Sequence, residues 1–172
     1  YQKFSGEYIR GHFQPKPSPC WACRMAHAHR VTVTEGPYRG YEAEEPEYEG
    51  FAAFGPLIGQ SDPGAAVMLN DTNDRLGMDL KESGFVLSLA MECYEKGIIT
   101  LEDTDGVELR WGNAEAARVM LEKIARREGF GNVLAEGVMR AAEHIGSDAP
   151  KFAIYAKRGI APHTHQLQGR LQ

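Results

Sequence analysis

Two consecutive helices are predicted in residues 61–97, which read SDPGAAVMLNDTNDRLGMDLKESGFVLSLAMECYEKG. The triplet SDP is an N-terminal capping signal with proline in the first turn, and it predicts a helix over about 63–76. Gly77 is expected to end that helix. Apolar residues then recur at three- and four-residue spacings, which predicts a second helix over about 79–96, ended by Gly97.

The rest of the chain predicts further helices and a few short strands. The pattern downstream indicates helices over about 114–127, with Asn113 as N-cap, and about 132–144. Upstream, a β-branched alternating stretch followed by a turn-like segment predicts a short hairpin over roughly 30–44. The remaining expectations are an irregular connector over 1–19, short extended pieces within 98–110 and a strand over 151–156.

These elements predict a fold class that is mainly α with short β strands. Residues 1–60 are expected to form a connector with the short hairpin, and residues 61–172 a helical domain. Within the first part, the small and apolar stretch 51–59 suits the close approach of a ligand.

Composition narrows the class of protein. The chain has 172 residues with 42% hydrophobic and 25% charged side chains, which is typical of a globular protein with a real core. A net charge of −5 argues against non-specific nucleic-acid binding, which depends on Lys and Arg against phosphates. No apolar run reaches the ~18 residues of a membrane span, and no signal peptide opens the chain. The first residue is Tyr rather than Met, so we expect these residues to belong to a longer protein.

The cysteines indicate metal binding. There are three of them, and Cys20 and Cys23 form a C-x2-C pair, which a short turn brings to one side of the backbone. We expect them to be reduced, in the cytoplasm. His27 completes a plausible three-ligand set; the alternative is a pair of core cysteines beside a surface histidine. Cys93 lies among apolar residues of the second helix and is expected to be buried in the core.

A run of carboxylates follows the predicted hairpin. Glu44, Glu45, Glu47 and Glu49 are interleaved with Pro46 and Tyr48, so we expect at least one of them to be partly buried. Burial would raise its pKa and make it a candidate proton donor or acceptor. The alternative is a solvated acidic face.

Two further segments carry candidate binding residues. Between the two central helices, Asp74, Gly77 and Asp79 fit either helix capping or recognition of a polar heterocycle by free N–H groups and carboxylates. Near the end of the chain stand Tyr155, Lys157, His163 and His165, which form a plausible site wall or a solvated loop.

The order of these segments resembles the tungsten-containing aldehyde ferredoxin oxidoreductase family. The matching pieces run from residue 20 to about 159: Cys20-x2-Cys23, Glu45-Pro-Glu-Tyr-Glu49, Asp74-Arg-Leu-Gly77-Met-Asp79, Trp111-Gly-Asn113, Arg127-Glu-Gly129, Leu134-Ala-Glu-Gly137 and Lys157 near a glycine. The family has an N-terminal β-rich pterin domain followed by two largely helical domains. This chain is similar to the middle region, the helical domain region of a multi-domain tungstopterin oxidoreductase.

The resemblance implies a tungsten (or molybdenum) bis-pterin centre beside a [4Fe–4S] cluster. Cys20 and Cys23 match the first two cluster cysteines, whereas the third falls at His27. Imidazole can replace thiolate at iron, as in Rieske centres, and the alternative is a rearranged site. The fourth cysteine is expected beyond Gln172.

The resemblance also implies roles for the polar residues. Asp74, Gly77 and Asp79 match a pterin-contacting motif, and so does Lys157, while Glu49 matches the carboxylate near the metal. The aldehyde-oxidising members carry a catalytic histidine where this chain has Tyr155. His163 or His165 could supply that imidazole, as in the tungsten subunit of the ATP-independent benzoyl-CoA reductase.

The expected function is therefore redox chemistry on a carbonyl-type substrate, such as oxidation of an aldehyde to a carboxylate. Expected partners are ferredoxin or another electron-carrier protein, within a homo-oligomer or a larger complex. The alternatives are the catalytic subunit of an aromatic acyl-CoA reductase and a non-catalytic zinc or iron–sulfur module.

Overall fold

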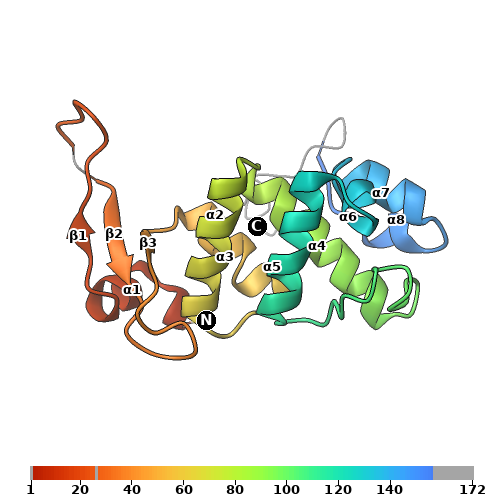
Figure 1. Cartoon of the computed structure of the whole chain (residues 1–172), viewed down its shortest axis with the longest axis horizontal. Helices are drawn as coiled ribbons and strands as arrows, with labels where there is room; N and C mark the ends of the chain where they lie inside the picture. The colour runs from red at the N-terminus through yellow and green to blue at the C-terminus, as the bar shows by residue number, and fades with distance from the viewer. Residues whose placement is uncertain (1, 26, 157–172) are drawn as a thin grey trace, which may run out of the picture.

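The computed structural model describes residues 2–25 and 27–156, which form a small sheet at one end and a group of packed helices (Figure 1). The helices, in chain order, are η1 Gln2–Phe4, α1 Gly6–His12, α2 Tyr48–Ala53, η2 Pro56–Ile58, α3 Pro63–Leu76, α4 Leu80–Glu95, α5 Ala114–Arg126, α6 Phe130–Leu134, α7 Val138–Ile145 and α8 Ala149–Phe152. The strands are β1 Lys16–Pro17, β2 His29–Thr32 and β3 Glu42–Glu44. The prediction of a mainly helical fold with short strands is confirmed.

The sheet is antiparallel in the order β1-β2-β3, and the β2–β3 pair is the predicted hairpin. Arg30 pairs with Glu44, so the hairpin brings the acidic run back beside β2. The register turns Val31 and Ala43 inward, onto a small core shared with α1, α2 and α3. That core consists of Ile9, Phe13, Val31, Val33, Ala43, Phe51, Ala66 and Val67.

Helices α3 and α4 begin and end within a residue of the predicted positions because their caps are local. The Asp62 side chain accepts a hydrogen bond from the Gly64 N–H at 2.9 Å. Gly77 ends α3 in the left-handed conformation, with φ of +72°, which glycine adopts without strain. Asp79 then caps α4 by accepting from the Glu82 N–H at 2.8 Å, so the capping interpretation of Asp79 is confirmed.

Helix α4 is the centre of the larger core and packs against α2, α5, α7 and α8. Its buried residues form a broad apolar face, as the spacing predicts for a helix covered on several sides. Cys93 is fully buried there, which confirms its predicted place in the core. Burial raises the pKa of its thiol to about 11, so the thiol stays protonated and packs as a small apolar group.

Three sequence-based expectations about the C-terminal half are wrong. The single helix predicted over 132–144 is two helices, α6 and α7, because Gly137 has a φ of +86° and interrupts the helical turn. The strand predicted over 151–156 is instead the end of α8 followed by irregular chain. The extended pieces predicted within 98–110 form no strand: residues 98–99 are a bend and residues 107–110 are irregular. Residues 101–106 between them are a turn, held by the buried Thr104 hydroxyl, which donates toward nearby carbonyls.

The connector 1–19 is also more ordered than predicted. Ser5 caps α1 by accepting a hydrogen bond from the Tyr8 N–H at 3.1 Å. The helix is short because Phe13 leaves the helical conformation and its backbone joins the sheet, accepting from the Thr32 N–H at 2.8 Å. Strand β1 was missed as well, since a two-residue strand containing proline carries almost no sequence signal.

Replacing Asn113 with alanine should destabilise the helical part. The Asn113 side chain caps α5 by accepting from the Ala116 N–H, and it also donates to the Glu108 carbonyl, both at 3.1 Å. We expect Asn113→Ala to lower the free energy of unfolding by about 1 kcal/mol. Denaturant unfolding measures this, with Asn132→Ala as control because Asn132 is exposed on α6. Equal losses in the two variants would contradict the capping role.

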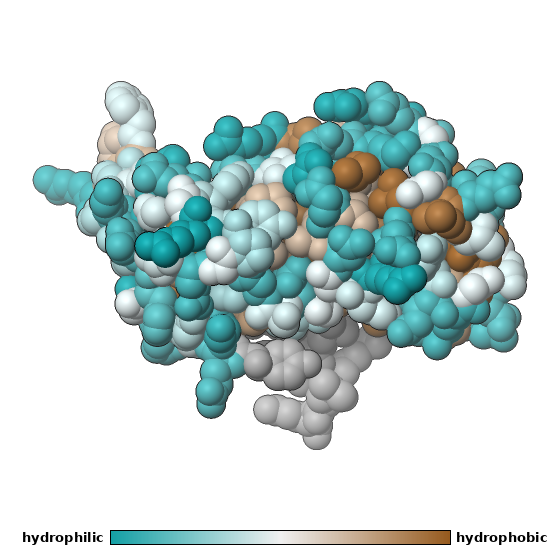
Figure 2. Space-filling model, turned by 60° about the horizontal axis from the view of Figure 1, so that its bottom comes forward, coloured by the Kyte–Doolittle hydropathy of each residue, from teal (hydrophilic) through white to brown (hydrophobic). Residues whose placement is uncertain are grey.

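The surface is mixed in character. On the face shown in Figure 2, hydrophilic side chains predominate at the sheet end and apolar ones gather toward the helical end. Within residues 2–25 and 27–156, we find no helix with the length and apolar character that crossing a bilayer requires.

Candidate cofactor-binding site

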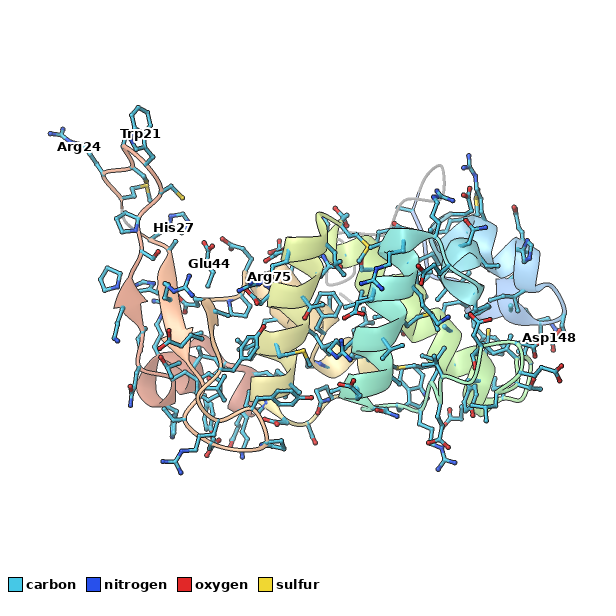
Figure 3. The ribbon with its side chains drawn as sticks, viewed as in Figure 1. Trp21, Arg24, His27, Glu44, Arg75 and Asp148 are labelled. Atoms are coloured by element: carbon cyan, nitrogen blue, oxygen red, sulfur yellow. The ribbon has the colours of Figure 1, made fainter. Side chains whose placement is uncertain are left out.

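The Cys20–Cys23 turn stands at the tip of the loop between β1 and β2, which projects away from the rest of the molecule (Figures 1 and 3). The Cys23 N–H donates to the Cys20 carbonyl at 3.0 Å and closes the turn. Both cysteines are free thiols; Cys20 is exposed and Cys23 half-buried. Trp21 between them is 98% exposed. The predicted turn is therefore present, with its sulfurs available to a ligand, and the alternative of core cysteines is wrong for this pair.

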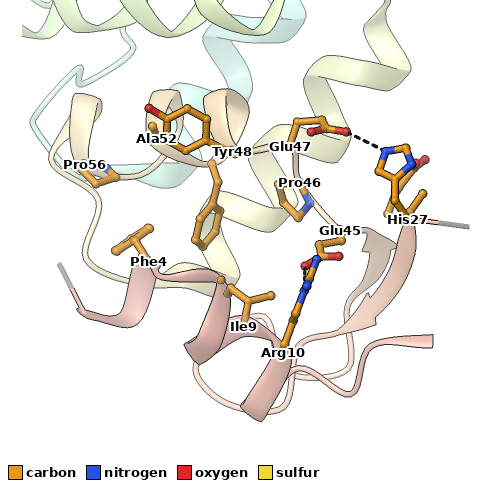
Figure 4. Close-up of a pocket in the computed structure, with 14 residues that line it drawn as sticks. Phe4, Ile9, Arg10, His27, Glu45, Pro46, Glu47, Tyr48, Ala52 and Pro56 are labelled. Atoms are coloured by element: carbon orange, nitrogen blue, oxygen red, sulfur yellow. Dashed lines mark hydrogen bonds and ion pairs between the residues drawn. The ribbon is translucent and has the colours of Figure 1, made fainter. Parts of the chain in front are cut away.

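His27 lies at the base of the same loop and faces the acidic run. Its Nε2 atom lies 3.8 Å from Oε1 of Glu47, and both side chains are mostly exposed (Figure 4). In the part of the chain that the structure describes, no three His, Cys, Asp or Glu side chains converge as a metal site would require. The predicted ligand set of Cys20, Cys23 and His27 is thus not gathered here and stays a prediction.

Glu45 is the half-buried member of the acidic run with the most contacts described, and partial burial was predicted for at least one of these residues. Its side chain is 15% exposed, and its two oxygens lie 3.1 Å from Nε of Arg10 and 2.9 Å from Nδ1 of His29. These contacts join α1, β2 and the segment before α2. Arg10 was not identified as a partner from the sequence, because the connector over 1–19 was expected to be irregular.

Glu49 lies in the first turn of α2 and is half-buried. A carboxylate is favourable there because the helix dipole is positive at its N-terminal end. Glu44 and Glu47 are exposed, so the acidic run divides into two half-buried carboxylates, Glu45 and Glu49, and two solvated ones.

A cavity of about 350 Å³ opens between α1, the segment 45–47 and α2 (Figure 4). Its walls are mostly apolar, and the rings of Phe4 and Phe51 lie 5.0 Å apart between centroids. The Arg10–Glu45 pair lies at one end, and Tyr48 lines the cavity from α2. The 51–59 stretch, for which a ligand approach was predicted, contributes Phe51, Ala52 and Pro56 to the lining, and His27 lines the cavity as well.

The α3–α4 junction holds the second group of predicted residues. Burial raises the pKa of Asp74, and the nearby charges of Glu44 and Asp71 raise it further. The amide of Asn70 donates to Asp74 Oδ2 at 3.0 Å and opposes that rise. Asp74 thus combines partial desolvation with solvent access, which is common among carboxylates that bind ligands.

Beside Asp74 runs a hydrogen-bonded network that the sequence did not indicate. The Tyr41 hydroxyl donates to Asp71 Oδ2 at 2.6 Å, and Arg75 Nε donates to the same oxygen at 2.7 Å. The network joins the hairpin to α3, and only the i, i+4 spacing of Asp71 and Arg75 was visible in the sequence.

Tyr41 gives a pH-dependent signature of this contact. Burial and the bond to Asp71 raise its pKa from 10.0 to about 12. The unfolded chain releases the phenolic proton first, so Tyr41 stabilises the fold fully below pH 10 and loses that contribution as the pH rises toward 12. We expect unfolding free energies of wild type and Tyr41→Phe to converge over this range. A constant difference between pH 9 and pH 12 would contradict the contact.

The last group of predicted residues is only partly described. Tyr155 lies in irregular chain after α8 and is 46% exposed. Lys157, His163 and His165 lie outside the described residues.

Three features define a candidate cofactor-binding region of a mainly helical protein. They are the two free thiols on the projecting turn, the Glu49 carboxylate at the start of α2 and the partly desolvated Asp74 carboxylate at the α3–α4 junction. The chain belongs to the aldehyde ferredoxin oxidoreductase family, since residues 1–170 match the family described as "Aldehyde ferredoxin oxidoreductase, domains 2 & 3".

Individual relatives agree with this membership. The chain is 39% identical over 155 residues to the tungsten-containing aldehyde ferredoxin oxidoreductase of Pyrococcus furiosus, covering 90% of this chain and 25% of that protein. It is 40% identical over 140 residues to the aliphatic sulfonate oxidoreductase, WOR-like subunit, of the same organism, covering 79% and 22%. The chain thus spans about a quarter of the length of the curated relatives it matches.

Among solved structures, the fold is similar to a chain of the active site complex BamBC of benzoyl coenzyme A reductase. The TM-score is 0.66 at 24% identity, and the match covers 84% of this chain and 21% of that one. This likeness shows a shared fold.

Proposed function

We propose that this chain is part of an oxidoreductase that uses a tungsten (or molybdenum) bis-pterin centre and a [4Fe–4S] cluster. The reaction is the oxidation or reduction of a carbonyl-type substrate, with aldehyde to carboxylate as the leading case. Ferredoxin or another electron-carrier protein takes the electrons. The observation that carries the proposal is the pair of free thiols on the Cys20–Cys23 turn, in a chain of this family.

The donor set of this chain fits part of a cluster site. Two thiolates separated by two residues suit two iron positions, and imidazole is an accepted third ligand type. His27 would take that role. The remaining ligand would come from a part of the protein outside the described residues.

The other predicted residues would hold the pterin and handle protons. Asp74 would accept hydrogen bonds from pterin N–H groups, with Gly77 and the Asp79 cap shaping the turn and Lys157 adding a positive charge. Glu49 would hold or transfer a proton at the start of α2. Tyr155, His163 and His165 would line the substrate side. When bound, the metal–pterin group supplies the two-electron redox step, and the protein orients the substrate.

A second candidate is the catalytic subunit of an aromatic acyl-CoA reductase. Tyr155 favours it, because it stands where the aldehyde-oxidising members of the family carry histidine. The fold shared with the benzoyl coenzyme A reductase complex is compatible with it. Both candidates imply reduced thiols, and we place the protein in the cytoplasm, in a homo-oligomer or a larger complex.

Steady-state assays on the full-length protein separate the two candidates. We expect aldehydes to reduce oxidised ferredoxin or a viologen dye. Oxidation of reduced dye that depends on an aromatic acyl-CoA would instead support the second candidate. A protein that holds tungsten and iron and shows neither activity would contradict both.

A further inference from the structure

Asn70 occupies an unusual position in the middle of α3. It is 3% exposed, and its Nδ2 atom donates to Asp74 Oδ2, one turn later, at 3.0 Å. This bond fixes the orientation of the side-chain amide, because the flipped amide would place its oxygen against a carboxylate. The Asn70 amide therefore donates its hydrogen bond to Asp74, the carboxylate that is proposed to contact the pterin.

The other end of the same amide is pressed against α2. A Cβ atom added to Gly50 would lie 1.9 Å from Asn70 Oδ1, so this contact requires glycine at position 50. Within the described part of the chain, no donor reaches this buried oxygen. Burying an unsatisfied amide oxygen costs stability, so the arrangement points to a role other than stabilising the core.

The contact joins two parts of the proposed site. Gly50 directly follows Glu49, and α2 and α3 pack against each other (Figure 1). One side chain therefore touches the helix that begins with the proposed proton-handling carboxylate and bonds the proposed pterin-contacting carboxylate.

We propose that Asn70 is a positioning residue of the pterin site: it orients the Asp74 carboxylate and sets its place relative to the helix of Glu49. The inference rests on the proposed function. The charged groups that face Asp74 are Glu44 on β3 and Asp71 on α3, and both oppose its ionisation. The Asn70 N–H is the contact that favours the ionised form, which is the form that accepts hydrogen bonds from a pterin.

The test measures pterin and tungsten per polypeptide in the full-length protein over a series of pH values. Asn70→Leu removes the donor, and Asn70→Asp keeps the shape but adds a like charge. In either variant the midpoint, which is the pH at which half of the pterin is retained, should move up by about one pH unit. At the wild-type midpoint the variant should therefore retain about fivefold less pterin than the wild type. Gly50→Ala should act in the same direction, since it displaces Asn70. The unfolding temperature of each variant checks that it is folded.

Two further variants make the outcomes distinguishable. Thr72→Val, which removes the bond from Thr72 Oγ1 to the Met68 carbonyl on the same helix, should leave the midpoint unchanged. Asp74→Asn should lose pterin at every pH. If Asp74→Asn loses pterin while folded Asn70 variants keep the wild-type midpoint, the positioning role is overturned and the proposed function stands. If Asp74→Asn keeps its pterin, the proposed role of Asp74 fails, and the inference fails with it.

Discussion

Replacing both Cys20 and Cys23 with serine should remove most of the iron from the full-length protein. A serine hydroxyl is not deprotonated near neutral pH and is a poor ligand for iron–sulfur clusters, which thiolates hold. We expect the iron content to fall on the order of tenfold or more. Mutating residues that only contact metal ligands already lowers metal affinity by about tenfold or more, so removing two ligands should have at least that effect. The characteristic visible absorbance of the cluster and ferredoxin-linked activity should disappear with it.

The fold should survive this double substitution, because the turn projects from the molecule and Cys20 is exposed. Its unfolding free energy should change by less than about 0.5 kcal/mol. The matched control is Cys93→Ser, which alters a buried thiol of α4 far from the turn in sequence. That control should lose stability and keep its iron. Iron retained in Cys20→Ser/Cys23→Ser would contradict the assignment of the turn to a cluster.

Leu87→Ala should have the largest effect on stability. Leu87 is fully buried in the middle of α4, the helix against which most of the others pack. Truncation removes apolar burial and leaves a cavity that close-packed neighbours refill poorly, at a cost of about 3 kcal/mol. Denaturant unfolding of the purified protein measures the loss.

The same substitution at Leu101 is the control. Leu101 is 49% exposed in the turn segment after α4, so Leu101→Ala should change the unfolding free energy by less than about 0.5 kcal/mol. Similar losses at the two leucines would contradict the burial of Leu87 and the central place of α4.

The central helices were predictable because their signals are local. Asp62, Asp79 and Asn113 each cap a helix within three residues of their own position, and Gly77 ends α3 by its backbone conformation. These are nearest-neighbour effects that the sequence displays directly. The break between α6 and α7 was missed because a glycine inside a helical pattern does not by itself show a positive φ. Gly137 adopts a φ of +86°, and the next N–H, that of Val138, donates to the distant Glu82 Oε1 at 2.7 Å.

The candidate site was predictable as a set of segments, but its contacts were not. The Cys20–Cys23 turn follows from spacing, and Asp74 was identified by resemblance. The environment of Asp74 depends on Asn70 and Glu44, and that of Glu45 on Arg10 and His29. Partners separated by more than one helical turn are set by tertiary packing, which a single sequence does not display.

Elemental analysis of the purified full-length protein tests the central claim most directly. The account predicts tungsten or molybdenum together with iron, at fixed ratios to the polypeptide. Zinc alone, with neither tungsten nor molybdenum and no iron, would contradict it and identify the Cys20–Cys23 turn with a zinc module.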